Sequence, residues 1–372
     1  MMSQLIRRAL GFSLGMSLLV AAPALAQSAD SNVESRLQAV IDAAVEDAPG
    51  IILLVDAPGV QFRGTGGLAN KKTGEAMNAD ATLRLGSITK TFVASIAIMA
   101  SNEGLLDLDA PISDYLAPDI MDRLPEGPDP TVRQLLNHTS GIPDYYSVRF
   151  YLLDWRDRGP LTTELVLHAI RGKKRVMEPG ERFSYSNTNY HLAALILEQV
   201  YGQDIQALFE TRIFEPVGLE NAHYGGSLPP GDTIHGYGGA IFPWTDTYNW
   251  EENTGPDGGA FASADDLIVW LRTLFTEDGA YADIVEAMQA HANPDGERTL
   301  QGMGVEILRS SAGDVIVGHT GGLEGYATAA FYIPSKDAAF VIHVNTLRNS
   351  ALNSALGATA RILLTMDEAP ND

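Results

Sequence analysis

Ser87 and Lys90 are the first residues whose types and spacing could do chemistry. They precede an apolar stretch, residues 91–101, that is typical of a buried helix. If Ser87 opens this helix, the Lys90 amine lies one turn further on, within reach of the serine hydroxyl. A desolvated lysine can lose its proton and activate that hydroxyl, and the helix start offers N–H groups to an oxyanion. The spacing alone would favour a helix cap followed by a surface lysine.

Tyr185 and Asn187 form a second candidate group, just before a helix predicted at residues 189–201. A tyrosine beside a lysine cation can have its phenol pKa lowered and work as a general base. An asparagine amide can orient both a substrate carbonyl and the lysine. The structural alternative is a buried tyrosine followed by a helix-capping asparagine.

A third candidate segment runs from Gly318 to Gly322 and follows a strand predicted at residues 315–317. Glycines on a strand mark the close approach of another backbone or of a ligand. His319 could supply a proton or a positive charge, Thr320 a hydroxyl, and Gly322 a backbone N–H donor. A hairpin turn with an incidental histidine is the alternative.

Taken together, the three segments resemble the motifs of the serine β-lactamase and penicillin-binding-protein superfamily: Ser-x-x-Lys, Tyr-x-Asn and Lys- or His-Thr-Gly. Tyr-Ser-Asn with His-Thr-Gly is similar to the branch of class C β-lactamases, D-alanyl-D-alanine carboxypeptidases and family VIII esterases. Three further stretches resemble this family in the same order: residues 106–116, 131–143 and 258–267. The resemblance therefore covers nearly the whole chain after residue 26.

This resemblance implies a serine hydrolase that forms an acyl-enzyme on Ser87 and cleaves an amide or an ester. Lys90 would keep Ser87 activated and share its proton with Tyr185, the expected base for acylation and deacylation. Asn187 would hold the carbonyl side of the substrate. The backbone N–H groups of Ser87 and Gly322 would form the oxyanion hole, and no metal or organic cofactor is implied.

Within the third motif, the resemblance assigns His319 to catalysis and Thr320, Gly321 and Gly322 to substrate and oxyanion binding. The reaction that we expect first is that of a D-alanyl-D-alanine carboxypeptidase or of a β-lactamase-like enzyme. A carboxylesterase of the same fold is an alternative. A non-catalytic protein that binds peptidoglycan or penicillin is another.

His319 departs from the pattern of many relatives, which have lysine at this position. A histidine with a pKa near 6.5 is mostly neutral at pH 7, so it would attract a substrate carboxylate less strongly than lysine. Peptidase or esterase activity is therefore at least as expected as efficient β-lactam hydrolysis. Turnover of a carboxylate-bearing substrate should then depend on a group that titrates between about pH 6 and 7.5. Arg298 or Arg309 could bind the carboxylate instead.

The composition narrows the classes of partner. The chain has 372 residues and no cysteine, with 25 Lys and Arg against 47 Asp and Glu, a net charge of −22. Its length allows a sizeable core, and its acidity argues against nucleic acid as a partner. Without cysteine there is no disulfide, thiolate nucleophile or zinc–thiolate site. We expect a small-molecule or cell-wall peptide substrate, no nucleic acid and no stable membrane insertion; the oligomeric state stays open.

The first 26 residues are typical of a cleavable signal peptide. Arg7 and Arg8 precede an apolar run, residues 9–22, that is shorter than the roughly 20 residues of a spanning helix. Small residues at Ala24 and Ala26 predict cleavage after Ala26 and a periplasmic or secreted product. An uncleaved anchor or a buried helix is the alternative, and the export route stays open.

The remaining pattern predicts an α/β (α+β) fold. Strands are expected at residues 50–55, 60–65, 315–317, 326–333 and 338–344, and terminal helices at 33–44 and 350–365. They predict an antiparallel five-stranded sheet with the terminal helices over one face. Ser263 and Asp266 form a plausible capping box for a further helix.

A stretch rich in proline and aspartate, residues 104–259, separates the two groups of strands. Helical segments are expected within it at residues 131–137, 163–171, 189–201 and 205–213. We therefore expect a sheet domain of residues 27–103 and 260–372, a mostly helical inserted domain of residues 104–259, and an active site at their interface. Aromatic stretches at residues 145–155 and 242–250 are expected to line or roof the cleft, with ordinary packing nearly as well supported.

Overall fold

The computed structural model describes residues 33–147, 150, 161–225, 234–238, 245–248, 255–276, 279, 281–296, 299–347 and 349–366. The predicted signal peptide lies outside these ranges. Within them, no helix combines the length and the apolar character that crossing a membrane requires.

A nine-stranded antiparallel sheet is the centre of the fold, in the order β3-β2-β1-β14-β13-β12-β11-β10-β9. Its long strands are β2 (Val60–Asn70), β1 (Gly50–Ala57), β14 (Ala338–Val344), β13 (Tyr326–Ile333) and β12 (Val315–Leu323). The predicted number of five strands is too small. Short strands extend the sheet on both sides: β3 (Glu75–Ala76), β11 (Glu306–Arg309), β10 (Thr299–Gln301) and β9 (Asn293–Pro294). Segments of two to four residues are too short to show a strand periodicity.

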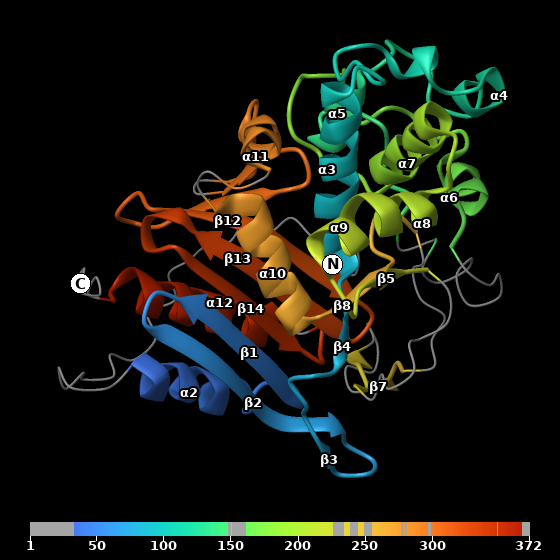
Figure 1. Ribbon diagram of the computed structural model, residues 1–372. Helices are drawn as coiled ribbons and strands as arrows, with labels where there is room; N and C mark the ends of the chain where they lie inside the picture. The colour runs from blue at the N-terminus through green and yellow to red at the C-terminus, as the bar shows by residue number, and fades with distance from the viewer. Residues whose placement is uncertain are drawn as a thin grey trace.

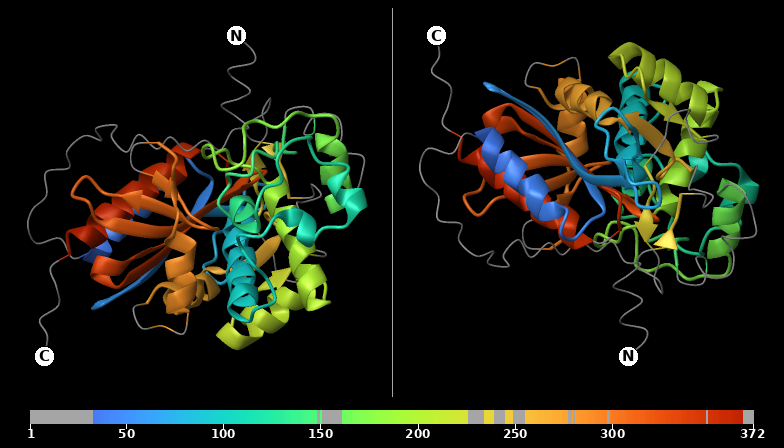
Figure 2. Two further views of the ribbon diagram at one scale, coloured as in Figure 1. Left: turned by 90° about the horizontal axis from the view of Figure 1, so that it is seen from above. Right: turned by 90° about the horizontal axis from the view of Figure 1, so that it is seen from below.

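Helices cover both faces of this sheet. The predicted terminal helices, α2 (Val33–Ala44) and α12 (Asn349–Leu364), lie together on one face, whereas α10 (Ala264–Phe275) crosses the other (Figures 1 and 2). Strand β1 shows the reason: Ile51 belongs to the core under the terminal helices and Ile52 to the core on the opposite side. Side chains that alternate along a strand point to opposite faces, so a strand apolar throughout needs cover on both.

A largely helical segment leaves the sheet region after β4 (Thr82–Arg84) and returns at β8 (Ala260–Ser263). These two strands pair with each other, and β5 (His223–Tyr224) pairs with β8. The segment contains α3 (Thr89–Asn102), α4 (Pro118–Met121), α5 (Val132–Leu136), α6 (Thr163–Ile170), α7 (Thr188–Tyr201), α8 (Ile205–Phe209) and α9 (Glu215–Val217). Two further short strands, β6 (Tyr237–Gly238) and β7 (Thr245–Asp246), pair with each other, and α11 (Ala282–Gln289) precedes β9. The predicted domain boundaries at residues 103 and 259 stay a prediction.

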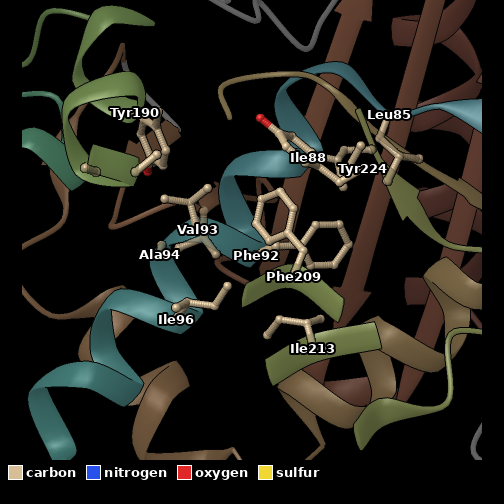
Figure 3. Close-up of a cluster of buried hydrophobic side chains, with 14 of the residues drawn as sticks. Leu85, Ile88, Phe92, Val93, Ala94, Ile96, Tyr190, Phe209, Ile213 and Tyr224 are labelled. Atoms are coloured by element: carbon tan, nitrogen blue, oxygen red, sulfur yellow. The ribbon is translucent and has the colours of Figure 1, made fainter. Parts of the chain in front are cut away.

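Helix α3 lies in the middle of the core, as its apolar sequence predicts. The ring of Phe92 is fully buried and lies 6.0 Å from that of Phe209, 5.6 Å from that of Phe214 and 5.0 Å from that of Trp270, measured between ring centroids. Figure 3 shows Phe92 beside Phe209, with Ile96 and Ile213 further along. This packing fixes the helix whose first turn carries Lys90.

Replacing Phe92 with alanine should lower the free energy of unfolding by about 3–5 kcal/mol, because it leaves a cavity among rings that cannot collapse into it. Urea denaturation followed by fluorescence measures this change. Val269→Ala, on α10, is the control, since its side chain is 40% exposed and the change should stay within about 0.5 kcal/mol. An equal effect of the two substitutions would contradict the assignment of Phe92 to the centre of the core.

Candidate active site

Ser87 lies in a single 3₁₀ turn, Gly86–Ile88, that runs directly into α3. The structure thus places Ser87 at the start of this helical segment and Lys90 in its first turn, as the spacing predicts. The Lys90 amine donates a hydrogen bond to the Ser87 hydroxyl at 2.9 Å. The alternative of a surface lysine is wrong, because Lys90 is completely buried.

Three oxygen atoms surround the Nζ atom of Lys90. Besides Ser87 Oγ, they are Oδ1 of Asn187 at 2.9 Å and the backbone carbonyl of Asp257 at 2.5 Å. An ammonium group has three protons to donate, so this arrangement matches its charged form. Burial nevertheless lowers the pKa of Lys90 to about 8, against the opposing effect of the Asp257 and Asp144 carboxylates. A substantial fraction of the amine is therefore neutral slightly above neutral pH.

Tyr185 donates a hydrogen bond from its phenol to Ser87 Oγ at 2.9 Å, so Ser87 is held from two sides. The Lys90 amine lies 5.2 Å from the centre of the tyrosine ring. The predicted lowering of the phenol pKa is wrong, because burial raises the pKa of Tyr185 well above its usual range. The phenol is thus a proton donor in this structure, and the sequence could not show this because the desolvation comes from distant segments.

Asn187 precedes α7 and connects Lys90 to the partly buried carboxyl group of Asp144. Its backbone N–H donates to Asp144 Oδ1 at 3.1 Å and its Nδ2 to Asp144 Oδ2 at 3.3 Å, while its Oδ1 accepts from Lys90. Burial raises the pKa of Asp144 to about 6. Asn187 does not cap α7 through its side chain, so its amide serves the lysine.

The third motif lies inside strand β12, which continues to Leu323 instead of ending at residue 317. Thr320 donates from its hydroxyl to Glu306 Oε1 at 2.8 Å, and His319 Nδ1 lies 3.7 Å from the same oxygen. Burial, with Lys90 nearby, lowers the pKa of His319 to about 3, so His319 is not a group that titrates between about pH 6 and 7.5. The neighbour with a pKa near neutrality is Glu306, whose pKa burial raises to about 7.

The glycines of this motif allow β12 to touch the turn that carries Ser87. A Cβ atom on Gly321 would lie 1.8 Å from the carbonyl oxygen of Leu85, and one on Gly86 would lie 2.7 Å from the nitrogen of Gly322. Gly86 also has a φ of +53°, in the left-handed region that favours glycine. The two segments whose N–H groups are assigned to the oxyanion hole are therefore adjacent, and the role of Ser87 and Gly322 there stays a prediction.

Two residues that the motifs did not assign to the site, Asp257 and His138, contact its side chains or the residues packed around them. Asp257, 3% exposed, accepts hydrogen bonds on its carboxylate from Tyr145 at 2.8 Å and from His191 at 2.9 Å. His138 has a φ of +59° and stacks on the Tyr185 ring, with centroids 4.1 Å apart. The only sequence signal for His138 is its position in the stretch 131–143 that resembles the family, and Asp257 has no such signal.

A pocket opens beside Ser87, lined by Ser87, Tyr185, Asp295, Gln301, Glu306, His319 and Thr320.

The other predicted features of the site have different outcomes. Arg309 is exposed at the end of β11 that lies away from Glu306, and this position does not favour it as the partner of a substrate carboxylate. Arg298 lies outside the described residues. Of the predicted aromatic stretches only parts are described; in the first, Tyr145 is packed in the core. Across the described part of the chain, no group of three or more His, Asp or Glu side chains could hold a metal ion.

Comparisons with known proteins agree with the resemblance found in the motifs. The Beta-lactamase family model matches residues 37–363. The D-aminopeptidase of Brucella ovis is 26% identical over 330 residues, which is 83% of this chain and 59% of that protein, so the chain spans little more than half of this curated relative.

Among solved structures, a D-stereospecific amidohydrolase from Streptomyces sp. is similar with a TM-score of 0.75 and 26% identity, covering 87% of this chain and 98% of that one. The octameric penicillin-binding protein homologue from Pyrococcus abyssi has a TM-score of 0.76 and 25% identity, over 89% of this chain and 76% of that one. The mixed fold with its antiparallel sheet is thus confirmed. With the family match extending over most of its length, the chain belongs to the Beta-lactamase family.

Proposed function

We propose that this chain is an exported enzyme that forms an acyl-enzyme on Ser87 and hydrolyses the amide bond of a D-aminoacyl substrate. The observation that carries the proposal is the pair of hydrogen bonds on Ser87 Oγ, from Lys90 and from Tyr185, each 2.9 Å long. An alcohol needs an adjacent base to attack an amide, and a buried amine with a pKa of about 8 can supply it. The names of the relatives, D-aminopeptidase and D-stereospecific amidohydrolase, support the choice of substrate.

In the proposed reaction, neutral Lys90 takes the proton of Ser87 as Oγ bonds to the amide carbonyl carbon. The N–H groups of Ser87 and Gly322 stabilise the negative oxygen that forms. Tyr185 passes its proton to the leaving amine as the C–N bond breaks, and the Lys90 ammonium restores the phenol. Water then adds to the ester carbonyl and gives a proton to Lys90, so that the acid leaves and Ser87 regains its hydrogen. Lys90 thus replaces Tyr185 in the role of base that the motifs suggest.

A D-alanyl-D-alanine carboxypeptidase is the finer function that the motifs suggest first. Such a substrate ends in a carboxylate and needs a positive partner in the pocket. Of the described residues lining the pocket, none carries a positive charge, since His319 is neutral at pH 7. This composition favours an aminoacyl amide over a peptide with a free carboxyl end.

A substrate panel tests the proposal. D-alanine p-nitroanilide should be hydrolysed with a kcat/KM at least about tenfold above that of its L-enantiomer, and above the release of D-alanine from N-acetyl-lysyl-D-alanyl-D-alanine. Cleavage of p-nitrophenyl esters without any anilide would identify a carboxylesterase instead. A lasting adduct with penicillin and no turnover of any substrate would identify a binding protein.

The pH dependence of the reaction should follow Lys90. Because the amine must be neutral to accept the proton of Ser87, kcat/KM should rise with pH and reach half its maximum near pH 8. A neutral p-nitrophenyl ester is the substrate of choice, since it does not itself titrate. An inflection near pH 6 instead would contradict the assignment of Lys90 as the base.

Export is proposed from the first 26 residues alone, with cleavage after Ala26 and a periplasmic or secreted product. Expression of the whole chain with a C-terminal tag, followed by cell fractionation and N-terminal sequencing, tests it. A mature chain that begins at Gln27 supports the proposal, and an uncleaved cytoplasmic chain contradicts it.

A further inference from the structure

The pocket beside Ser87 is acidic on the side formed by the short strands at the end of the sheet. Asp295, in the turn between β9 and β10, and Glu306, at the start of β11, both line it. Gln301, on β10, and Thr320, on β12, complete this side. The pocket therefore combines the nucleophile with two carboxyl groups.

Glu306 is a mostly buried carboxyl group at the wall of this pocket. The residue is 6% exposed, and its Oε1 accepts a hydrogen bond from Thr320 at 2.8 Å. The backbone N–H of Thr320 also interacts with this carboxylate, which lines the pocket beside Ser87. A mostly buried carboxylate is costly unless donors surround it, so its pocket side is suited to a donor that arrives with a ligand.

Asp295 adds a second negative charge to the same pocket. Its Oδ2 accepts a hydrogen bond from Gln301 at 3.3 Å, which leaves Oδ1 for another donor. The Asp295 carboxylate adds to burial in raising the pKa of Glu306. A cation placed between the two carboxyl groups would relieve this repulsion and favour the charged form of both.

We propose that Asp295 and Glu306 form a subsite that binds the free α-ammonium group of an aminoacyl substrate. An ammonium group donates three hydrogen bonds, and the α-nitrogen is separated from the carbonyl carbon attacked by Ser87 by only one atom. The subsite thus deepens the proposed function, on which it rests, by specifying an unblocked amino group. A metal ion fits less well, because no third acidic or histidine ligand joins these two in the described residues.

The test compares two esters that differ only at this nitrogen, D-alanine methyl ester and N-acetyl-D-alanine methyl ester. The wild-type enzyme should prefer the free ammonium in kcat/KM. In Asp295→Asn and in Glu306→Gln the ratio of the two kcat/KM values should fall by about tenfold or more, mainly through KM. Asp42→Asn removes the same charge from exposed α2, on the far face of the sheet, and should leave the ratio unchanged.

An unchanged ratio of the two kcat/KM values in both pocket variants would overturn the proposal. If both esters lose activity by the same factor, the ratio is also unchanged, and the two residues have a structural role. Calorimetry separates this result from the proposed function, because it needs no turnover. The Ser87→Ala protein should bind D-alaninamide about tenfold more tightly than N-acetyl-D-alaninamide, and Asp295→Asn in that background should remove the difference. If the enzyme cleaves no amide but this preference persists, the proposed amide hydrolysis fails and the subsite stands.

Discussion

Replacing Ser87 with alanine is expected to lower kcat by about 10⁴- to 10⁶-fold, the loss typical of removing a nucleophile. Among the described residues, Ser87 Oγ is the hydroxyl that accepts a hydrogen bond from both Lys90 and Tyr185. Without this oxygen, the two groups can only act on a water molecule. The measurement is kcat with the best substrate of the panel, beside a circular dichroism spectrum that reports the fold.

Ser186→Ala is the matched control for this variant. Ser186 is also buried and lies in the second motif, yet its Oγ has no hydrogen-bond partner in the described structure. Its loss should change kcat less than about threefold, since surface or unpaired groups contribute little. Activity of Ser87→Ala within tenfold of the wild type would contradict the assignment of Ser87 as the nucleophile.

Replacing Lys90 with methionine is expected to lower kcat/KM by about 10²- to 10⁴-fold, the contribution of a positioned general base. Methionine fills a similar buried volume without the amine. The rise of activity around pH 8 should disappear with it, because the group that titrates there is gone. A merely structural lysine would lower activity without altering the shape of the pH profile.

Lys72→Met serves as the control, because Lys72 is exposed on the turn between β2 and β3 and lies outside the pocket. It should keep both the activity and the pH profile of the wild type. If Lys90→Met retained a rise near pH 8, another group would have to be the base, and the proposed mechanism would be wrong.

Periodicity predicted the regular parts of the fold closely. The helix at residues 33–44 and the strands at 326–333 and 338–344 have the bounds that the sequence analysis gave them. The capping box of Ser263 and Asp266 is present at the start of α10. These are segments in which local pattern and burial agree. Strand β12 was predicted too short because its glycines resemble a turn, although they are needed for contact with the Ser87 segment.

The side chains of the site were predicted from three motifs, whereas their protonation was not. Ser87, Lys90, Tyr185 and Asn187 come together as expected. The pKa directions of Tyr185 and His319 were missed, because desolvation depends on segments far away in the sequence. Glu306 belongs to no motif and could be recognised only once β11 was placed beside β12.

Intact-protein mass spectrometry tests the central claim, that Ser87 becomes acylated. The full chain is mixed with a fluorophosphonate or with the best ester substrate and quenched in acid within milliseconds to seconds. We predict one added group per chain, located on the peptide that contains Ser87 and absent from Ser87→Ala. An adduct that persists in Ser87→Ala, or that maps to another residue of the wild-type chain, would contradict the account.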